Sequence, residues 1–79
     1  MIEIYGKTNC PYCDRAKALC EQKGYEYNYH MLDEDFTREE LFEKFPTART
    51  FPQITARGEY IGGYTEFAEW SEGLRRVWF

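Results

Sequence analysis

The chain has 79 residues and a formal net charge of −4 at pH 7. This length fits a single domain over residues 1–79, and six Phe, seven Tyr and two Trp residues supply the apolar area that so small a core needs. The acidic balance argues against nucleic acid as a partner, and no apolar run approaches the ~18 residues of a membrane span. Because no basic leader precedes the first apolar run, we expect a cytoplasmic protein.

The first half of the chain predicts a strand, a helix and a second strand. Residues 1–5 alternate between apolar and polar positions, as a strand does. Pro11 suits the first position of a helix, which is expected to run to about Lys23 and to end at Gly24. Residues 25–31 form the second strand, so the two strands are predicted to be parallel with a right-handed crossover.

Side-chain spacing assigns faces to these elements. On the helix one side is expected to carry Tyr12, Ala16, Leu19 and Lys23, and to overlap the positions of Cys13 and Cys20. On the second strand the three tyrosines at 25, 27 and 29 share a core or half-buried face. His30 lies on the opposite face with Glu26 and Asn28, and we expect it to be exposed to solvent.

The second half predicts a helix, a hairpin and a last helix. Thr37 and Glu40 form a capping box for the first of these helices, whose apolar side carries Leu41, Phe42 and Phe45 and which Pro46 ends. Strands at 53–56 and 59–61 flank Arg57-Gly58, a two-residue hairpin signal. Thr65 is the predicted N-cap of the last helix, whose apolar positions are Phe67, Trp70, Leu74, Val77 and Trp78.

The cysteines indicate redox chemistry. Cys10, Cys13 and Cys20 are odd in number and close in sequence, which suits a reducing compartment rather than a secreted disulfide framework. In Cys10-Pro-Tyr-Cys13, Cys10 takes the N-cap position, where unpaired N–H groups and the helix dipole stabilise a thiolate. Lys7 adds a positive charge, and thiols so placed have pKa values of roughly 3.5–7.5. Cys10 is therefore the predicted attacking thiolate, and the more shielded Cys13 the resolving thiol.

A zinc site is the alternative reading of two cysteines at this spacing. Structural zinc usually has four ligands, and beyond the pair only Cys20 and His30 remain. Cys20 follows Cys13 at a poor spacing for a shared metal, so no metal is expected. We interpret Cys20 instead as a buried, unreactive thiol.

Three segments of the chain resemble the glutaredoxin family. Gly6-Lys-Thr-Asn-Cys10-Pro-Tyr-Cys13 is similar to the active-site segment of dithiol glutaredoxins. Thr50-Phe51-Pro52 resembles the family's Thr-x-Pro segment with its cis-proline, and residues 61–65 resemble its Gly-Gly loop. The resemblance implies an α/β, thioredoxin-like fold of order β-α-β-α-β-β-α, with a four-stranded mixed sheet (strand order 2-1-3-4) flanked by three helices.

The resemblance also implies glutathione as co-substrate, with a site that holds both ends of the tripeptide. Lys7 is expected to bind the glycine carboxylate, with Arg49 as a second cation beside Thr50. Tyr12 is expected to pack against the tripeptide. The backbone of Phe51, next to Pro52, is expected to pair with the cysteinyl unit as an added strand would.

The γ-glutamyl end is expected at the start of the last helix. Gly63, Tyr64 and Thr65 open that helix, whose N-terminus is suited to a carboxylate. Many relatives carry Asp where this chain has Thr65, so a partner for the γ-glutamyl amine is missing, and Glu66 is the neighbouring acid that can replace it.

The function that follows is a monomeric, glutathione-dependent oxidoreductase. It would reduce protein disulfides and mixed disulfides with glutathione, with ribonucleotide reductase among the candidate acceptors. One alternative is a redoxin reduced by thioredoxin reductase, but such proteins typically lack the Gly-Gly loop and the tyrosine between the cysteines. The other is an iron–sulfur carrier, whose family members usually replace Pro11 by a small residue or Cys13 by Ser.

Overall fold

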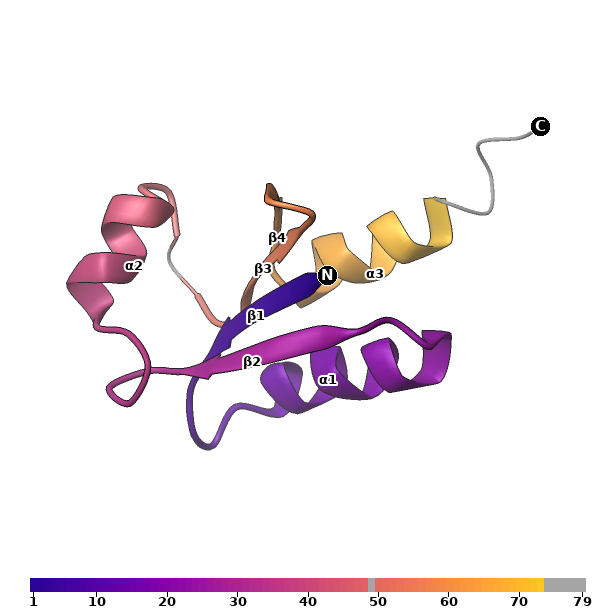
Figure 1. Cartoon of the computed structure of the whole chain (residues 1–79), viewed down its shortest axis with the longest axis horizontal. Helices are drawn as coiled ribbons and strands as arrows, with labels where there is room; N and C mark the ends of the chain where they lie inside the picture. Colours follow the sequence, from indigo (N-terminus) through magenta and orange to yellow (C-terminus); the bar gives the residue numbers. More distant parts are fainter. Residues whose placement is uncertain (49, 74–79) are drawn as a thin grey trace.

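A computed structural model describes residues 1–48 and 50–73. The elements are β1 (Ile2–Gly6), α1 (Pro11–Lys23), β2 (Tyr27–Met31), α2 (Arg38–Lys44), β3 (Gln53–Ala56), β4 (Glu59–Gly62) and α3 (Tyr64–Gly73) (Figure 1). This is the predicted order β-α-β-α-β-β-α. In these two stretches of chain, no helix is long and apolar enough to cross a bilayer.

The four strands form one mixed sheet in the order β2-β1-β3-β4, as predicted. β1 runs parallel to β2, with Ile4 opposite Tyr29, and antiparallel to β3, with Ile4 opposite Ile54. The β3–β4 hairpin turns at Arg57 and Gly58, whose φ angles of 54° and 84° are both positive, as a two-residue type I′ turn requires. The thioredoxin-like fold expected from the sequence is therefore confirmed.

One face of the sheet packs against α1 and α3, which also contact each other. The alternation of β1 sends Ile2 and Ile4 to this face, and both are buried. The fully buried ring of Phe67 joins them from α3. The other buried members of this cluster are Ala16, Cys20, Ile54 and Ala56, and the three tyrosines at 25, 27 and 29 pack against its edge.

The opposite face of the sheet carries a second, smaller cluster built around α2. Tyr5, the β1 neighbour of Ile4, lies on this side and meets Phe36 and Phe45 edge-on, with ring centroids 5.4 Å apart in both pairs. Leu41 and Ala48 complete the buried part of the cluster. The α2 cluster therefore meets the second face of the sheet through Tyr5, and β1 supplies side chains to both clusters.

Local sequence signals place the helix ends. Cys10 has an extended backbone and caps α1, whose C-terminal Gly24 adopts the left-handed conformation with φ 74°. Both halves of the predicted capping box at α2 are present: Glu40 N–H donates to the Thr37 hydroxyl, and Thr37 N–H donates to the Glu40 carboxylate. These interactions satisfy backbone groups that the helix itself leaves unpaired.

Several predicted positions are corrected. β2 begins at Tyr27, because the Tyr25 N–H still bonds back to the Cys20 carbonyl at 2.8 Å and so belongs to the end of α1. On α1 the core-facing residues are Cys13, Ala16 and Cys20, whereas Tyr12 keeps 53% of its surface exposed. On α2, Phe42 lies outside the apolar side expected for it and is exposed.

Two further corrections concern His30 and Thr65. His30 is half-buried: its ring stacks on Tyr5 at 4.7 Å, and its Nε2 lies 2.6 Å from the Glu3 carboxylate. α3 begins at Tyr64, so Gly63 takes the cap position and Thr65 lies inside the first turn. Leu74, Val77 and Trp78, predicted to extend this helix, lie outside the described residues.

Candidate redox site

The centre of the site is a disulfide between Cys10 and Cys13 at the start of α1. The Cys13 backbone N–H donates to the Cys10 Sγ at 3.1 Å, so the cap position of Cys10 aims a helix-terminal donor at its sulfur. Cys10 keeps 7% of its surface exposed and Cys13 none. Of the two sulfurs, the one that an outside thiol or disulfide reaches first therefore belongs to Cys10, and the backbone donor and helix dipole favour its anionic form.

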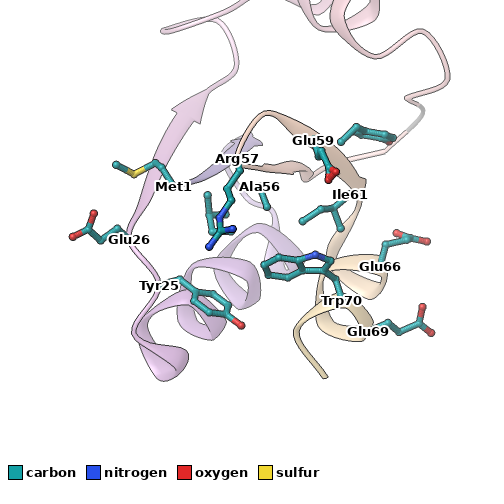
Figure 2. A pocket seen from close by; sticks show the side chains of 12 residues that line it. Met1, Tyr25, Glu26, Ala56, Arg57, Glu59, Ile61, Glu66, Glu69 and Trp70 are labelled. Atoms are coloured by element: carbon teal, nitrogen blue, oxygen red, sulfur yellow. The ribbon is translucent and has the colours of Figure 1, made fainter. Parts of the chain in front are cut away.

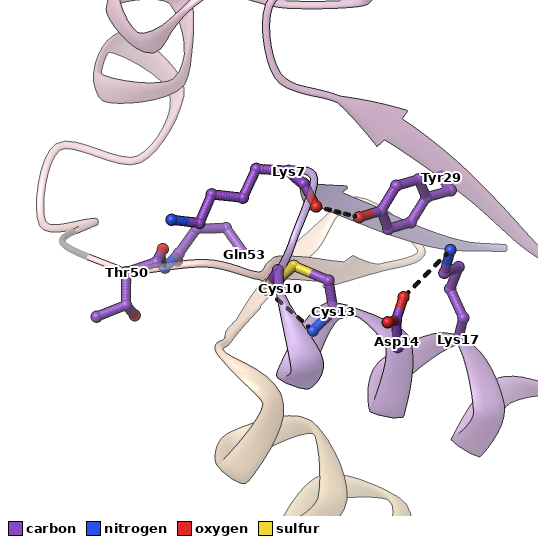
Figure 3. The surroundings of a disulfide bond; sticks show 8 residues. All are labelled: Lys7, Cys10, Cys13, Asp14, Lys17, Tyr29, Thr50 and Gln53. Carbon is purple, nitrogen blue, oxygen red and sulfur yellow. Dashed lines mark hydrogen bonds and ion pairs between the residues drawn. A yellow bond between two sulfur atoms is a disulfide. The ribbon is translucent and has the colours of Figure 1, made fainter.

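The loop before Cys10 is supported by β2. The Tyr29 hydroxyl donates to the Lys7 carbonyl at 3.3 Å, and Lys17 from α1 lies over the Tyr29 ring at 4.3 Å (Figure 3). A Cβ on Gly6 would approach the Cys13 Sγ to 2.9 Å and the Tyr29 Cζ to 2.7 Å. Only glycine lets Tyr29 and the buried sulfur pack this closely against the end of β1. The same burial raises the pKa of Tyr29.

The segment before β3 lies beside the disulfide and carries the predicted cis bond between Phe51 and Pro52. In Figure 3 the Lys7 side chain extends toward Thr50 and Gln53. Its Nζ lies 5.7 Å from the centre of the Phe51 ring, and the Arg38 guanidinium approaches the same ring at 5.9 Å. Two cations from distant parts of the chain thus meet at one aromatic side chain next to the proline.

The start of α3 closes the site from the other side. A Cβ on Gly63 would lie 3.4 Å from the Pro52 carbonyl oxygen, which places the Gly-Gly loop against the cis-proline. Tyr64 brings its ring to within 5.9 Å of the Tyr12 ring on α1. The structure therefore gathers the predicted α1, β3 and α3 residues around the disulfide. Thr65 is exposed in the first turn of α3, and Arg49 lies outside the described residues.

Arg38 is a site residue that sequence reasoning missed. It is the first residue of α2, where the sequence marks it only as a charged position after a capping box. No local pattern connects this residue with Phe51, because the contact depends on how Phe51 packs against the side-chain cluster around α2. Arg15 was missed for a similar reason: its guanidinium lies 5.1 Å from the ring of Tyr12 at the rim of the site.

The third cysteine is separate from this chemistry. Cys20 is free, fully buried among apolar side chains of α1 and the sheet, and burial raises the pKa of its thiol to about 11. The predicted burial of Cys20 is confirmed, and its lack of reactivity stays a prediction. Within residues 1–48 and 50–73, no three His, Cys, Asp or Glu side chains are grouped closely enough to hold a metal ion.

Another groove, of about 910 Å³, lies at the other end of the sheet. It is lined by the start of β1 and the β3–β4 turn, with Tyr25 and Trp70 as its aromatic walls (Figure 2). The disulfide, by contrast, follows the far end of β1. A smaller groove of about 350 Å³ adjoins the redox site and contains Thr50, Gln53 and Gly63 among its walls.

A helix-capping cysteine paired with a second one turn later, beside a cis-proline in a four-stranded mixed sheet, defines a thiol–disulfide oxidoreductase of thioredoxin-like fold. Within that class the chain belongs to the glutaredoxin family, whose sequence profile matches residues 2–61.

Individual relatives agree with this assignment. Glutaredoxin 1 of Escherichia coli is 42% identical over 74 residues, which cover 85% of this chain and 87% of that protein. The structure of reduced E. coli glutaredoxin matches with a TM-score of 0.78 and 38% identity, covering 91% of this chain and 93% of that one. A buckwheat glutaredoxin–glutathione complex matches with a TM-score of 0.79 and 29% identity, covering 91% of this chain and 68% of the other.

Proposed function

We propose that this chain is a glutathione-dependent dithiol–disulfide oxidoreductase that reduces protein disulfides and mixed disulfides with glutathione. The observation that carries the proposal is the setting of the Cys10 sulfur. It is the more accessible member of the pair and accepts the Cys13 N–H. It lies between a cation-flanked Phe51 and the start of α3, and these two features are suited to the two carboxylates of glutathione.

Reduction of a substrate disulfide takes two exchanges. The Cys10 thiolate attacks one sulfur of the substrate, a mixed disulfide forms, and the other substrate sulfur leaves as a thiolate. The Cys13 thiolate then attacks the Cys10 sulfur, which closes the Cys10–Cys13 disulfide and releases the second substrate thiolate. The buried position of Cys13 supports this division of roles, because an outside disulfide does not reach it directly.

Glutathione restores the dithiol in two further exchanges. One glutathione thiolate attacks the Cys10 sulfur, and Cys13 leaves as a thiolate that takes up a proton. A second glutathione attacks the sulfur that glutathione contributed to this mixed disulfide. The products are oxidised glutathione and the Cys10 thiolate, so two glutathione molecules supply the two electrons that the substrate consumed.

The proposed binding mode uses residues on three sides of the sulfur. Lys7 and Arg38 receive the glycine carboxylate, because both place a cation beside Phe51. The Phe51 backbone pairs with the cysteinyl unit, and the exposed ring of Tyr12 packs against the tripeptide. The N–H groups of Gly63, Tyr64 and Thr65 face the γ-glutamyl carboxylate. The similarity to a buckwheat protein in complex with glutathione supports this mode. Arg49, predicted to assist Lys7, remains a prediction.

A coupled assay with NADPH tests the proposal. One arm contains glutathione and glutathione reductase, and the other contains thioredoxin reductase alone. With a glutathione mixed disulfide as substrate, we expect NADPH oxidation that depends on this chain in the first arm only. Turnover only in the second arm would contradict glutathione dependence and identify thioredoxin reductase as the electron source.

The cellular compartment, the protein acceptor and the oligomeric state are also part of the proposal. A dithiol maintained by glutathione suits the reducing cytoplasm, and ribonucleotide reductase is a candidate acceptor because it requires a dithiol donor. We propose further that residues 1–79 act as one domain and as a monomer. Sedimentation of the purified chain, with and without oxidised glutathione, tests the oligomeric state.

A further inference from the structure

The amide side chain of Gln53 links two segments beside the redox site. Its Nε2 donates to the Thr50 carbonyl at 2.6 Å, and its Oε1 accepts a hydrogen bond from the Tyr60 hydroxyl. Figure 3 shows Gln53 and Thr50 together on the side of the disulfide toward which Lys7 extends. Gln53 keeps only 3% of its surface exposed, so these two hydrogen bonds fix the orientation of its amide.

Tyr60 reaches Gln53 from β4, the strand next to β3 in the sheet. Its ring stacks on Phe45 at the end of α2, with ring centroids 4.8 Å apart, and this contact holds the hydroxyl in place. Partial burial, with Glu66 nearby, raises the pKa of Tyr60 above its ordinary value of 10. The hydroxyl is therefore protonated at neutral pH and able to donate to the amide.

The Thr50 carbonyl belongs to the same peptide unit as the Phe51 N–H. A peptide unit is planar, and in its trans form the carbonyl oxygen and the N–H point in opposite directions. The cis bond of this segment comes one residue later, between Phe51 and Pro52. When Gln53 fixes the Thr50 carbonyl, it therefore also fixes the direction of the Phe51 N–H, which is part of the backbone that the proposed binding mode pairs with the cysteinyl unit.

We propose that Gln53 and Tyr60 are positioning residues that direct the Phe51 N–H toward the cysteinyl unit of a disulfide substrate. The inference rests on the proposed function, because it takes the Phe51 backbone as the partner of that unit. Neither residue needs to touch the reacting sulfurs. Gln53 acts through the Thr50 carbonyl, and Tyr60 acts by holding the Gln53 amide in the orientation that presents Nε2 to this carbonyl.

This role predicts an effect that depends on the substrate. Oxidised glutathione carries peptide groups beside its sulfurs, and these can pair with the Phe51 N–H. Bis(2-hydroxyethyl) disulfide carries none, so a misdirected N–H does not change its rate of reaction. The reduced Cys10–Cys13 pair converts either disulfide to two thiols as its own disulfide closes, so the measurement needs no further reductant. A change in the cysteines themselves would alter both rates.

The test compares Tyr60→Phe with Tyr27→Phe in the full chain. The first variant removes only the hydroxyl and keeps the ring that stacks on Phe45. The second removes an exposed hydroxyl that donates to Glu21 of α1 at 2.9 Å. Each reduced protein is mixed with one disulfide, and the reaction is stopped with acid at set times and analysed by mass spectrometry.

We expect Tyr60→Phe to react about two- to ten-fold more slowly than wild type with oxidised glutathione, and at the wild-type rate with bis(2-hydroxyethyl) disulfide. Tyr27→Phe is expected to match the wild type with both. The pKa of Cys10, obtained from iodoacetamide alkylation rates against pH, is expected to be the same in Tyr60→Phe and wild type. This readout separates positioning of the substrate from a change in the thiolate.

Gln53→Met is the second variant, because it removes both hydrogen bonds at similar side-chain volume. Its rate with oxidised glutathione is expected to fall at least as far as that of Tyr60→Phe. Adding Tyr60→Phe to Gln53→Met is expected to lower the rate no further, because the hydroxyl acts through the amide. If the two effects instead add in full, Tyr60 does not act through Gln53 and the inference is wrong.

The remaining outcomes separate this inference from the proposed function. Equal slowing of Tyr60→Phe with both disulfides, or no slowing with oxidised glutathione, overturns the positioning role and leaves glutathione dependence intact. Dithiothreitol supplies the intrinsic reactivity of the two disulfides. A wild type whose preference for oxidised glutathione is no greater than that of dithiothreitol overturns the proposed recognition of glutathione, and the positioning role with it.

Discussion

The backbone N–H of Cys13 points at the sulfur of Cys10, with 3.1 Å between nitrogen and Sγ. This relationship arises because Cys10 caps α1 and Cys13 lies one turn into it. The same turn that supplies the donor buries Cys13 completely. The start of α1 therefore stabilises the thiolate form of Cys10 and shields the sulfur of Cys13 from outside disulfides.

The two cysteines are expected to respond differently to substitution. Cys10→Ser abolishes disulfide exchange, because a hydroxyl is not ionised at neutral pH. Cys13→Ser keeps the attacking thiolate, so it accumulates a glutathione adduct on Cys10 and still reduces glutathione mixed disulfides, but it no longer reduces protein disulfides. Mass spectrometry after treatment with oxidised glutathione checks both results. An adduct on Cys13 of the Cys10 variant, formed at the wild-type rate, would show that the roles are reversed.

Lys7 is expected to serve both reactivity and binding. Lys7→Ala raises the pKa of Cys10 by less than about one unit, because a partly exposed charge contributes ~0.3–1 kcal/mol while the helix dipole and N–H donors remain. It also weakens glutathione coupling. Iodoacetamide alkylation rates measured against pH give the pKa, and kinetics with varied glutathione give the coupling. If neither quantity changes, Lys7 is only a surface charge.

Thr65→Ala is the matched variant that is expected to change glutathione binding but not the reactivity of Cys10. Thr65 lies in the first turn of α3, at the proposed γ-glutamyl end. Its loss is expected to weaken glutathione coupling and to leave the titration of Cys10 almost unchanged. If Thr65→Ala shifts the Cys10 pKa as much as Lys7→Ala does, then Thr65 does not act on glutathione binding alone and the prediction is wrong.

Cys20 is expected to be unreactive toward thiol reagents in the native state. Its burial and the pKa of about 11 keep the thiol neutral and inaccessible. Reduced native protein therefore reacts with N-ethylmaleimide at Cys10 but labels Cys20 only after denaturation. Cys20→Ser retains activity and loses about 1–3 kcal/mol of unfolding free energy, since a hydroxyl replaces an apolar contact. Cys20→Ala, which adds no hydroxyl, is expected to cost less; equal labelling of Cys10 and Cys20 would contradict the prediction.

Gly6→Ala is expected to disturb the site by overpacking the space between β1, Tyr29 and Cys13. The added Cβ would meet the Tyr29 Cζ at 2.7 Å and the Cys13 Sγ at 2.9 Å, so both side chains must move. Overpacking of this kind costs about 1–3 kcal/mol, measurable as a lower urea midpoint. Gly73→Ala is the control, because a Cβ there meets nothing within 4 Å. Equal midpoints for the two variants would show that the strand end relaxes without cost.

The Glu3–His30 pair is expected to make stability depend on acid pH. The hydrogen bond from His30 lowers the pKa of Glu3 below its ordinary value of 4.5. A carboxyl with a lowered pKa contributes stability above that ordinary value, and the contribution is lost as the pH falls through the folded-state pKa. For a partly exposed pair the loss is about 1 kcal/mol or less.

Urea unfolding at pH 7 and pH 3 measures this contribution. We expect the wild type to lose more free energy of unfolding between these two pH values than Glu3→Gln does. His30→Ala, which removes the partner and keeps the carboxyl, is expected to resemble Glu3→Gln in this difference. An identical difference in wild type and both variants would show that the pair contributes nothing.

Local interactions explain what the sequence alone determined. The N-cap at Cys10, the left-handed Gly24, the capping box of Thr37 and Glu40, and the Arg57-Gly58 turn each join residues a few positions apart. Such contacts involve only residues that are near one another in the sequence, so the residue types predict them. Alternation along β1 and β2 predicted which residues share each face of the sheet. The order of elements, together with the resemblance to glutaredoxins, then predicted the strand order 2-1-3-4.

Tertiary structure decided what depends on contacts between distant segments. His30 was expected in solvent, but the register that sets Tyr5 opposite His30 gives it a ring and a carboxylate as neighbours. Lys7 and Arg38 both approach Phe51 only because Phe51 packs against the side-chain cluster that α2 shares with Tyr5. The start of α3 shifted to Tyr64 because Glu66 caps Gly63. Spacing in the sequence predicts contacts between residues that are close along the chain. Contacts between distant residues depend on the tertiary packing of α2, β2 and α3, which spacing does not reveal.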